Sequence, residues 1–299
     1  MNITLIGSFT LNDQQKQRLQ KLGTVTEVPT PASGEEWLQK VEGTDVICSD
    51  GSYLYENLTK LKNVFVTYPF IELGAFDSEA LKANGVTVAN TRGSNRDSIV
   101  EWTMFMVLAL FRDFVPKIRV AESPAFARTE SLQGKKVLIL GKGNIGSQAG
   151  VLAQTFGMQV DYFTRGDDLR AKSADADMVI NALSVNSTSK NLLNGVYFMG
   201  LKKGAYFVSF VRHFTYDIDG LIKSLKAGNV AGAAIDCDPE PLFDTTNDFY
   251  QKCLSNDKIL VTPHVAAVTE DARANAMETL VQNVEAFAAG NPQNVITKQ

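Results

Sequence analysis

The sequence has few of the side chains that most often hold metals or form cross-links. Its 299 residues include two histidines, His213 and His264, and three cysteines, Cys48, Cys237 and Cys253. The number of cysteines is odd and no Cys-x-x-Cys pair is present, which argues against a disulfide framework and against a structural zinc site. We therefore expect no metal and a reducing compartment.

Basic clusters are also missing. The formal net charge is −4, and the longest basic runs are the pairs at 135–136 and 202–203. Both pairs stand beside glycines at expected loop-to-strand junctions, where a solvated charge is the simplest interpretation. A domain that binds nucleic acid normally concentrates Lys and Arg on one face, so we expect no nucleic-acid partner.

No segment is long and apolar enough to cross a membrane. The longest apolar run extends from Ile99 to Phe111, is interrupted by Glu101, and is shorter than the roughly 20 residues that a spanning helix needs. The N-terminal segment, 1–7, is typical of a strand and lacks the basic region and the cleavage site of a secretory signal. We expect a cytoplasmic protein without a membrane partner.

What the sequence does contain is an alternation of short apolar strands and amphipathic helices, which is typical of parallel sheets covered by helices on both faces. In the first part of the chain the pattern predicts strands at 3–6, 25–28, 46–48, 64–67 and 86–89, and helices at 12–22, 34–41 and 77–83. A second unit begins at Gly134, with strands at 136–140, 159–163, 178–182, 205–208, 231–236 and 259–262, and helices at 144–156 and 215–227.

Two further helices define how the units are divided. Residues 95–119 predict a long helix that is apolar almost all round in its middle and therefore buried, and we place it between the units. The last helix, at 269–290, finds no remaining sheet in the second unit and is expected to pack on the first. We therefore predict an α/β protein with two doubly wound parallel-sheet (Rossmann-like) domains. The first is discontinuous, at 1–93 plus 267–299, and the second spans 94–266.

The most informative stretch is Val137–Gly146, in which an apolar strand leads into Gly141, Gly143 and Gly146 and then into a helix. In a dinucleotide-binding turn, the first glycine allows the tight turn, the second lets the backbone approach a pyrophosphate, and the third lets the helix pack closely on the strand. The helix N-terminus then offers free N–H groups to the phosphates. Because glycines also punctuate ordinary strand-to-helix turns, a purely structural turn is the alternative, but the flanking strand and helix favour nucleotide binding.

Reactive side chains follow three strands of the second unit, at the sheet edge where this architecture binds its ligand. His264 follows one strand and can transfer a proton near neutral pH. A carboxylate such as Glu240 would orient that imidazole, and the planar fork of Arg212 can hold a substrate carboxylate through two hydrogen bonds. Each residue alone also fits a structural role, as a core histidine, a solvated acid and a surface ion pair. Their convergence on one expected edge favours an active site.

Together these residues resemble the D-isomer-specific 2-hydroxyacid dehydrogenases over essentially the whole chain. The motifs that carry the resemblance are 141–146, 201–212, 231–241 and 262–269, together with 88–91 and 98–101. The resemblance implies that Arg212 clamps the carboxylate and keto oxygen of the substrate, that His264 is the general acid in reduction, and that Glu240 holds His264. It also implies that Asp236 bonds the nicotinamide carboxamide. The expected cofactor-binding residues are Thr103, Gly141, Gly143, Asn144, Ile145, Gly146, Thr164, Arg165, Leu183, Val211 and Asp236.

The end of the second strand of this unit decides between the two nicotinamide cofactors. An Asp or Glu there would bind the ribose 2′-hydroxyl of NAD(H), but the strand runs into Thr164 and Arg165. Asp161 lies inside the strand, and Arg165 can attract a 2′-phosphate. We therefore predict NADP(H), with NAD(H) as the alternative if Asp167 or Asp168 binds the ribose.

The substrate side departs from the family pattern. His213 stands where the family usually has glycine after the arginine. In the expected substrate loop, 68–74, Pro69 has no N–H to offer a carboxylate. By position, the expected substrate contacts are Tyr53, Phe70 and Ile71.

The leading hypothesis is an enzyme that transfers a hydride between NADP(H) and a small 2-keto acid or D-2-hydroxy acid, of the glyoxylate or hydroxypyruvate type. The alternative is a catalytically weak nucleotide-sensing or interaction protein on the same scaffold, which the altered substrate loop would suit. Arg212, Glu240 and His264 favour the enzyme, because a sensor does not need all three. The helix from Asn95 resembles one that packs across a twofold axis in the family, so we also expect a homodimer.

Overall fold

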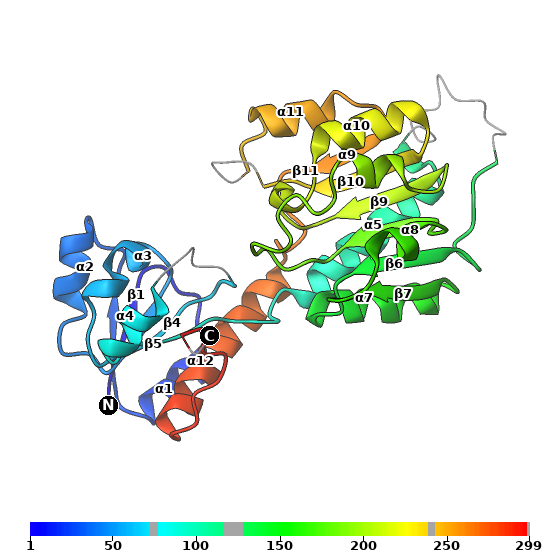
Figure 1. The fold of residues 1–299 in the computed structure, drawn as a ribbon. Coiled ribbons are helices and arrows are strands. Elements are labelled where there is room, and N and C mark those ends of the chain that lie inside the picture. The colour runs from blue at the N-terminus through cyan, green and yellow to red at the C-terminus, as the bar shows by residue number, and fades with distance from the viewer. Residues whose placement is uncertain (72–76, 116–127, 239–242, 298–299) are drawn as a thin grey trace. The chain divides into compact units, whose positions relative to one another are not determined.

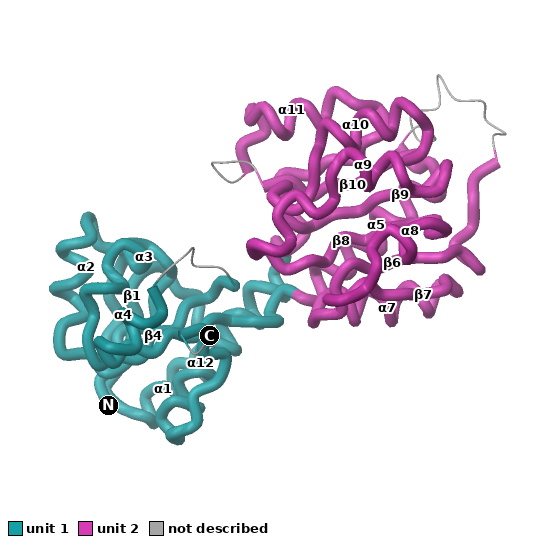
Figure 2. Tube along the Cα trace, viewed as in Figure 1, with its two compact units in different colours: residues 1–95, 269–299 teal, residues 96–268 magenta. Residues whose placement is uncertain are grey.

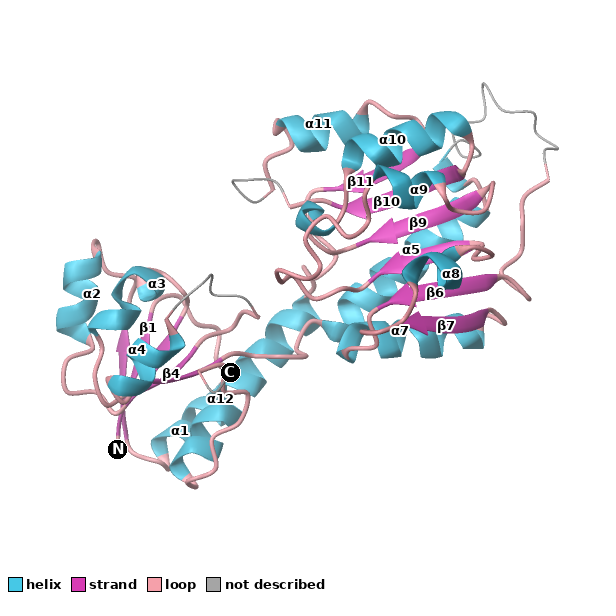
Figure 3. Ribbon diagram, viewed as in Figure 1, coloured by secondary structure: helices cyan, strands magenta, loops and turns pink. Residues whose placement is uncertain are grey.

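The computed structural model describes residues 1–71, 77–115, 128–238 and 243–297. It contains a five-stranded and a six-stranded sheet with helices packed against them (Figures 1 and 3), and every strand pair in both sheets is parallel. This confirms the α/β fold class that the alternation of strands and helices predicted. None of the described helices is long and apolar enough to cross a membrane.

The chain forms two compact units (Figure 2). Unit 1 comprises residues 1–95 and 269–299, and unit 2 comprises residues 96–268. Unit 1 is discontinuous because the C-terminal helix α12 (Glu270–Ala288) belongs to it, as the sequence pattern predicted.

The sheet of unit 1 has the strand order β2-β1-β3-β4-β5. Its strands are β1 (Asn2–Ile6), β2 (Thr24–Val28), β3 (Val46–Ser49), β4 (Phe65–Thr67) and β5 (Thr87–Ala89). Its other helices are α1 (Asp13–Gln20), α2 (Gly34–Lys40), α3 (Leu54–Asn57), the 3-10 turn η1 (Leu58–Lys60) and α4 (Ser78–Ala83). In this doubly wound order the chain reverses direction across the sheet between β1 and β3, which is where such sheets bind ligands.

Helix α12 completes the core of unit 1. Leu280 and Val284 are fully buried on its inner face, within the cluster that also contains strand residues of β1 and β3. The Phe287 ring stacks on that of Phe65 in β4, with centroids 4.4 Å apart. The expectation that the last helix returns to the first sheet is confirmed, because the apolar stripe of α12 is buried in the core of that sheet.

The sheet of unit 2 has the order β11-β10-β9-β8-β6-β7. Its strands are β6 (Lys136–Leu140), β7 (Gln159–Phe163), β8 (Met178–Asn181), β9 (Ala205–Ser209), β10 (Val230–Asp236) and β11 (Ile259–Thr262). These are the strands that the apolar runs predicted, within a residue or two at each end. The order places β6 between β7 and β8, so the reversal of this sheet lies at the carboxyl end of β6.

Both faces of the central strands of this sheet are buried, which explains why those strands are nearly continuous apolar runs. Successive residues of a strand point to opposite faces. In β6, Val137 and Ile139 join the cluster that contains α5 (Arg96–Phe111) and α7 (Asn144–Thr155). Leu138 and Leu140 join the opposite cluster, which contains α9, α10 and α11. The bounds of these helices are α9 (Gly195–Met199), α10 (Ile218–Ala227) and α11 (Asp248–Leu254), and α8 (Leu169–Ser173) and the 3-10 turn η2 (His213–Thr215) complete the unit.

Helix α5 is shorter than the sequence pattern predicted. It packs on β9, β10 and α7 and buries most of its residues, as its apolar composition indicated. It ends at Phe111, and Asp113 has a φ of 49°, in the left-handed region that interrupts a right-handed helix. The expected continuation to Arg119 is therefore wrong for the described part, and residues 116–127 lie outside it.

Candidate active site

The three glycines of the turn after β6 have three different surroundings. Gly141 has a φ of 101°, which a residue with a side chain adopts only with strain. A Cβ at Gly146 would lie 2.1 Å from the carbonyl oxygen of Gly141, so only glycine allows α7 to approach the strand this closely. A Cβ at Gly143 would meet nothing within 4 Å, so the space beside this backbone is open. Close packing at Gly146 and open space at Gly143 are the arrangement that a dinucleotide turn requires.

The N-terminus of α7 has no side chain to cap it. Gly143 is its N-cap residue, and the first N–H groups of a helix, here those of Asn144 and Ile145, have no partner within the helix itself. The helix is 12 residues long, so its dipole adds a partial positive charge at this end. The residues present therefore fit a dinucleotide, whose pyrophosphate would be held by these N–H groups.

Other expected cofactor residues lie at the same sheet edge. Leu183 follows β8, and its N–H donates to Asn181 Oδ1 at 3.3 Å. Val211 follows β9, and its N–H donates to Ser209 Oγ at 3.2 Å. Thr103 is different, because it is fully buried within α5 and its hydroxyl donates to the carbonyl oxygen of Ile99 at 2.7 Å. Its contact with a cofactor stays a prediction.

The carboxylates within β7 and just after it are engaged by neighbouring groups. Asp161 lies 3.0 Å from Lys172 Nζ. Asp167 accepts hydrogen bonds from the N–H and the hydroxyl of Thr164, at 2.7 and 3.0 Å, and these bonds lower its pKa. Asp168 caps α8 by accepting from two of its N–H groups. Arg165, by contrast, is exposed at the tip of β7.

Asp236, at the end of β10, organises the turn that carries His264. Its buried carboxylate accepts hydrogen bonds from the Thr262 hydroxyl at 2.6 Å, from the Val265 N–H at 2.9 Å and from the Ala266 N–H at 2.8 Å. Sequence reasoning missed this role. A carboxylate has about four lone-pair positions, and these three bonds leave one for the hydrogen bond to a nicotinamide carboxamide that the resemblance implied.

His264 follows β11 in a restrained geometry. Its φ is 62°, in the left-handed region that histidine adopts less rarely than most residues. Its Nδ1 atom is buried and makes no hydrogen bond with any described residue. Buried polar atoms are normally paired, so this nitrogen calls for a partner. Glu240, which the resemblance implied in that role, lies outside the described residues.

Arg212 follows β9 and lies beside an acid, Asp238, that the sequence pattern did not point to. Its Nε lies 3.9 Å from Asp238 Oδ2, and His213 Nδ1 lies 2.9 Å from Asp238 Oδ1. Two features of the sequence could have pointed to this contact. Asp238 lies two residues after Asp236, and His213 departs from the family pattern.

In unit 1, the expected substrate residues lie at the carboxyl ends of β3 and β4. Tyr53 has a φ of 56° and donates its hydroxyl hydrogen bond to Ala32 O at 3.1 Å. The Phe70 ring, 52% exposed, approaches Gly51, and the carbonyl of Ile71 accepts from Asn90 Nδ2 at 2.8 Å. Tyr53 and the Phe70 ring therefore lie near the reversal point of their own sheet, and Ile71 lies towards β5.

Sequence reasoning missed an acid at that reversal point. Asp50 follows β3 and accepts from the Ser8 N–H at 2.8 Å and from the Ser52 N–H at 2.9 Å. Gly7, with a φ of 110°, leaves room for this carboxylate, since a Cβ there would lie 2.1 Å from Asp50 Cγ. The glycine at the end of the first apolar strand was the signal that could have found it.

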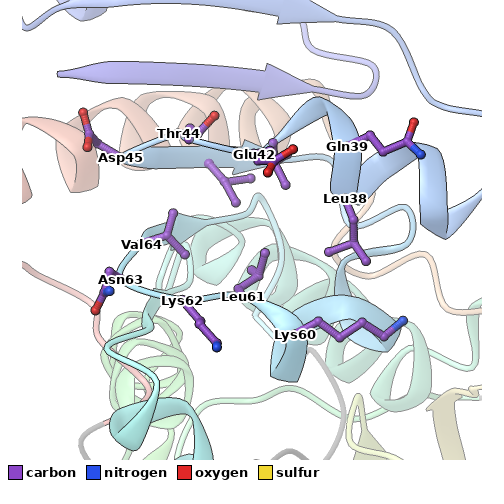
Figure 4. Close-up of a pocket in the computed structure, with 13 residues that line it drawn as sticks. Leu38, Gln39, Glu42, Thr44, Asp45, Lys60, Leu61, Lys62, Asn63 and Val64 are labelled. Carbon is purple, nitrogen blue, oxygen red and sulfur yellow. The ribbon is translucent and has the colours of Figure 1, made fainter.

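A cavity of about 650 Å³ lies at the opposite edge of the same sheet (Figure 4). It is lined by the segments before β3 and β4 and by the end of α2. Two lysines and two acids, Lys60, Lys62, Glu42 and Asp45, line it together, so its formal charges balance. It lies at the amino ends of the strands, away from the edge where doubly wound sheets bind ligands.

The parallel sheet of unit 2, the glycine turn at its reversal point and the uncapped α7 define a dinucleotide-binding α/β domain. The family model described as D-isomer specific 2-hydroxyacid dehydrogenase, NAD binding domain, matches residues 104–266. The chain belongs to the D-isomer specific 2-hydroxyacid dehydrogenase family, a family of oxidoreductases that act on CH–OH groups, and this region is its NAD(P)-binding domain. The resemblance found in the sequence is thereby confirmed.

Individual relatives are more distant. The D-3-phosphoglycerate dehydrogenase of Haemophilus influenzae is 30% identical over 215 residues, which cover 67% of this chain and 52% of that protein. The chain thus spans about half the length of that relative. The glyoxylate reductase of Thermococcus litoralis is 26% identical over 276 residues, covering 82% of this chain and 80% of that protein. A solved acyclic imino acid reductase in complex with NADPH and D-Arg has the same fold, with a TM-score of 0.79 and 20% identity over 99% of this chain and 100% of that chain.

Proposed function

We propose that the protein transfers a hydride between NADP(H) and a small 2-keto acid, giving a D-2-hydroxy acid. The observation that carries this proposal is the gathering of three features at one edge of the unit 2 sheet: the glycine turn, Arg212, and the turn that Asp236 ties down around His264. Residues 94–266 would form the dinucleotide-binding domain, and residues 1–93 with 267–299 the substrate-binding domain.

Each residue has a defined role in this chemistry. A reduced nicotinamide, when bound, supplies the hydride that reaches the keto carbon. Arg212 binds the substrate carboxylate through its planar fork and stabilises negative charge as it develops on the keto oxygen. His264 gives a proton to that oxygen, and Glu240 holds the imidazole. Asp236 keeps His264 in place through the backbone bonds at Val265 and Ala266.

The substrate class is proposed to be glyoxylate or hydroxypyruvate. The similarity to a glyoxylate reductase over most of both chains supports it. The direct test follows NADPH absorbance while the purified protein is given glyoxylate, hydroxypyruvate, pyruvate and longer 2-keto acids in turn. Turnover of the two small acids supports the proposal, and the absence of turnover with every acid refutes it.

A second candidate function is a nucleotide sensor on the same scaffold. The observation that favours it is the exposed Phe70 ring next to Pro69, which has no N–H to give a substrate carboxylate. A sensor would bind NADPH with micromolar or better affinity and oxidise it with none of the keto acids. The same absorbance assay, combined with a fluorescence titration of NADPH, separates the two functions.

Preference for NADP(H) is proposed from the tip of β7. Arg165 is exposed there, while Asp161, Asp167 and Asp168 are engaged by other groups. An Arg165→Ala variant is expected to raise the KM for NADPH about tenfold and to leave the KM for NADH within twofold, because only the former loses a charge-assisted contact. Arg170→Ala, on the neighbouring α8, is the matched control. A wild-type KM lower for NADH than for NADPH would contradict the preference.

A homodimer is proposed through the outer face of α5 and α7. Phe105 is 56% exposed, and Phe114, Val151 and Phe156 are also exposed large apolar side chains in this part of unit 2. The Phe105 and Phe114 rings lie 6.4 Å apart, centroid to centroid. Exposed apolar side chains that lie together are typical of a surface that another molecule covers, and twofold dimers are the commonest soluble oligomers. Phe105→Glu is expected to shift the mass measured by sedimentation from dimer to monomer. A monomeric wild-type protein would contradict the proposal.

A further inference from the structure

A buried acid joins the two basic side chains that follow β9. Asp238 follows β10, and only 9% of its side chain is exposed. Its Oδ1 accepts hydrogen bonds from the His213 ring, at 2.9 Å from Nδ1, and from the His213 N–H at 3.4 Å. Its Oδ2 lies 3.9 Å from Arg212 Nε. One carboxylate therefore faces two neighbouring residues of the β9 end.

The three side chains differ in how firmly they are held. The side chains of Arg212 and His213 are 44% and 51% exposed, whereas Asp238 is nearly covered. The His213 ring also packs on that of Phe249 in α11, with centroids 4.6 Å apart. The carboxylate is thus covered and the ring that binds it rests on Phe249, whereas Arg212 has the longest side chain of the three.

Asp238 remains charged near neutral pH. Burial raises its pKa, but the hydrogen bonds from His213 and the positive charges of His213 and Arg212 outweigh that effect, so its pKa lies below the usual value for an aspartate. Since an ionised carboxylate has no proton to donate, His213 Nδ1 is the donor in the 2.9 Å bond.

We propose that Asp238, held by His213, is a positioning residue that orients the Arg212 guanidinium for the substrate carboxylate. An anion beside Nε restricts rotation of the guanidinium, and two parallel hydrogen bonds to a carboxylate require that plane to be aligned. The inference rests on the proposed role of Arg212. It also explains the departure of His213 from the family pattern, because a glycine there would leave Asp238 without the ring that binds it.

Asp238 could also act on substrate binding in the opposite direction, so the sign of the change in KM tests the proposal. Asp238 also offsets part of the positive charge of Arg212, which weakens the attraction of any anion. If charge offset alone mattered, Asp238→Asn would tighten substrate binding. If positioning dominates, the same variant loosens it.

The test compares kcat and KM for the keto acid in matched variants. Asp238→Asn is expected to raise KM about tenfold, with kcat changed less and the Kd for NADPH unchanged. His213→Phe keeps a ring against Phe249 but removes the hydrogen-bond donor, so it should raise the KM for the keto acid as Asp238→Asn does. His213→Asn places an amide donor near the Nδ1 position and should restore much of the binding. Asp248→Asn, an exposed acid in the first turn of α11, is the control.

The outcomes distinguish this inference from the proposed function. Arg212→Lys should raise the KM for the keto acid. An unchanged KM in Arg212→Lys would refute the role of Arg212 itself. A raised KM in Arg212→Lys, together with an unchanged or lowered KM in Asp238→Asn, would refute only the positioning role of Asp238. A melting temperature close to that of wild type in both variants shows that the changes in KM do not come from unfolding.

Discussion

Replacement of His264 by alanine is expected to lower kcat about 10²- to 10⁴-fold, the usual contribution of a positioned general acid, and to leave NADPH binding intact. His264 follows β11 at the carboxyl edge of the unit 2 sheet, on a turn that three hydrogen bonds to Asp236 hold in place. Its Nδ1 atom is buried and has no partner among the described residues, so a carboxylate at that atom would complete the group that moves the proton.

The variant needs a control for backbone strain. His264 has a φ of 62°, where alanine is strained by about 1–2 kcal/mol and asparagine is better tolerated. His264→Asn should therefore retain the wild-type melting temperature while losing turnover as fully as His264→Ala. Undiminished turnover in both variants would show that another group supplies the proton.

The second large effect is expected at Gly143 and Gly146, which lie three residues apart in the turn after β6. Gly146→Ala puts a Cβ 2.1 Å from the carbonyl oxygen of Gly141, so the helix must move away from the strand. Overpacking of this kind costs about 1–3 kcal/mol, and the variant should lose both stability and NADPH binding.

Gly143→Ala meets no atom within 4 Å and has a φ of −75°, which alanine adopts readily. It should keep its melting temperature, or raise it slightly, and still bind NADPH at least about tenfold more weakly, because the methyl group occupies the approach of the pyrophosphate.

This pair of variants separates binding from folding. Thermal unfolding measures the stability of each protein, and fluorescence titration measures its Kd for NADPH. Unchanged NADPH affinity in Gly143→Ala would argue that the open space beside Gly143 is not where the dinucleotide lies, and that the turn is a structural one.

The sequence predicted the central strands well because they are buried on both faces and therefore form short apolar runs. The apolar run at 259–262, for example, coincides with β11, and the predicted bounds of β6 and β7 match as closely, although β7 is an edge strand that alternates apolar with polar residues. Short helices were missed, since α8, α9 and α11 have only five to seven residues and show too little of the helical period to be recognised. The overextension of the helix after Asn95 has a local cause, the left-handed conformation at Asp113, which leaves no mark on the hydrophobic pattern.

The site was predictable to the extent that it depends on the order of elements. Residues that directly follow parallel strands meet at one edge, and this rule gathers Arg212, Asp236 and His264 from the sequence alone. What each side chain contacts depends on the path of the turns. The bonds from Asp236 to residues 26 to 30 positions further along the chain have no sequence signature. The pairing of Asp238 with His213, 25 positions earlier, likewise follows from the adjacency of β9 and β10.

The activity proposed for this chain is the transfer of a hydride from a reduced nicotinamide to a 2-keto acid. The most direct measurement uses NADPH carrying deuterium at C4 with glyoxylate or hydroxypyruvate, and analyses the product by mass spectrometry and chiral chromatography. We expect a 2-hydroxy acid with deuterium at C2 from one C4 position of the cofactor, of D configuration when hydroxypyruvate is the substrate. Formation of no labelled product, or of the L-hydroxy acid from hydroxypyruvate, would contradict it.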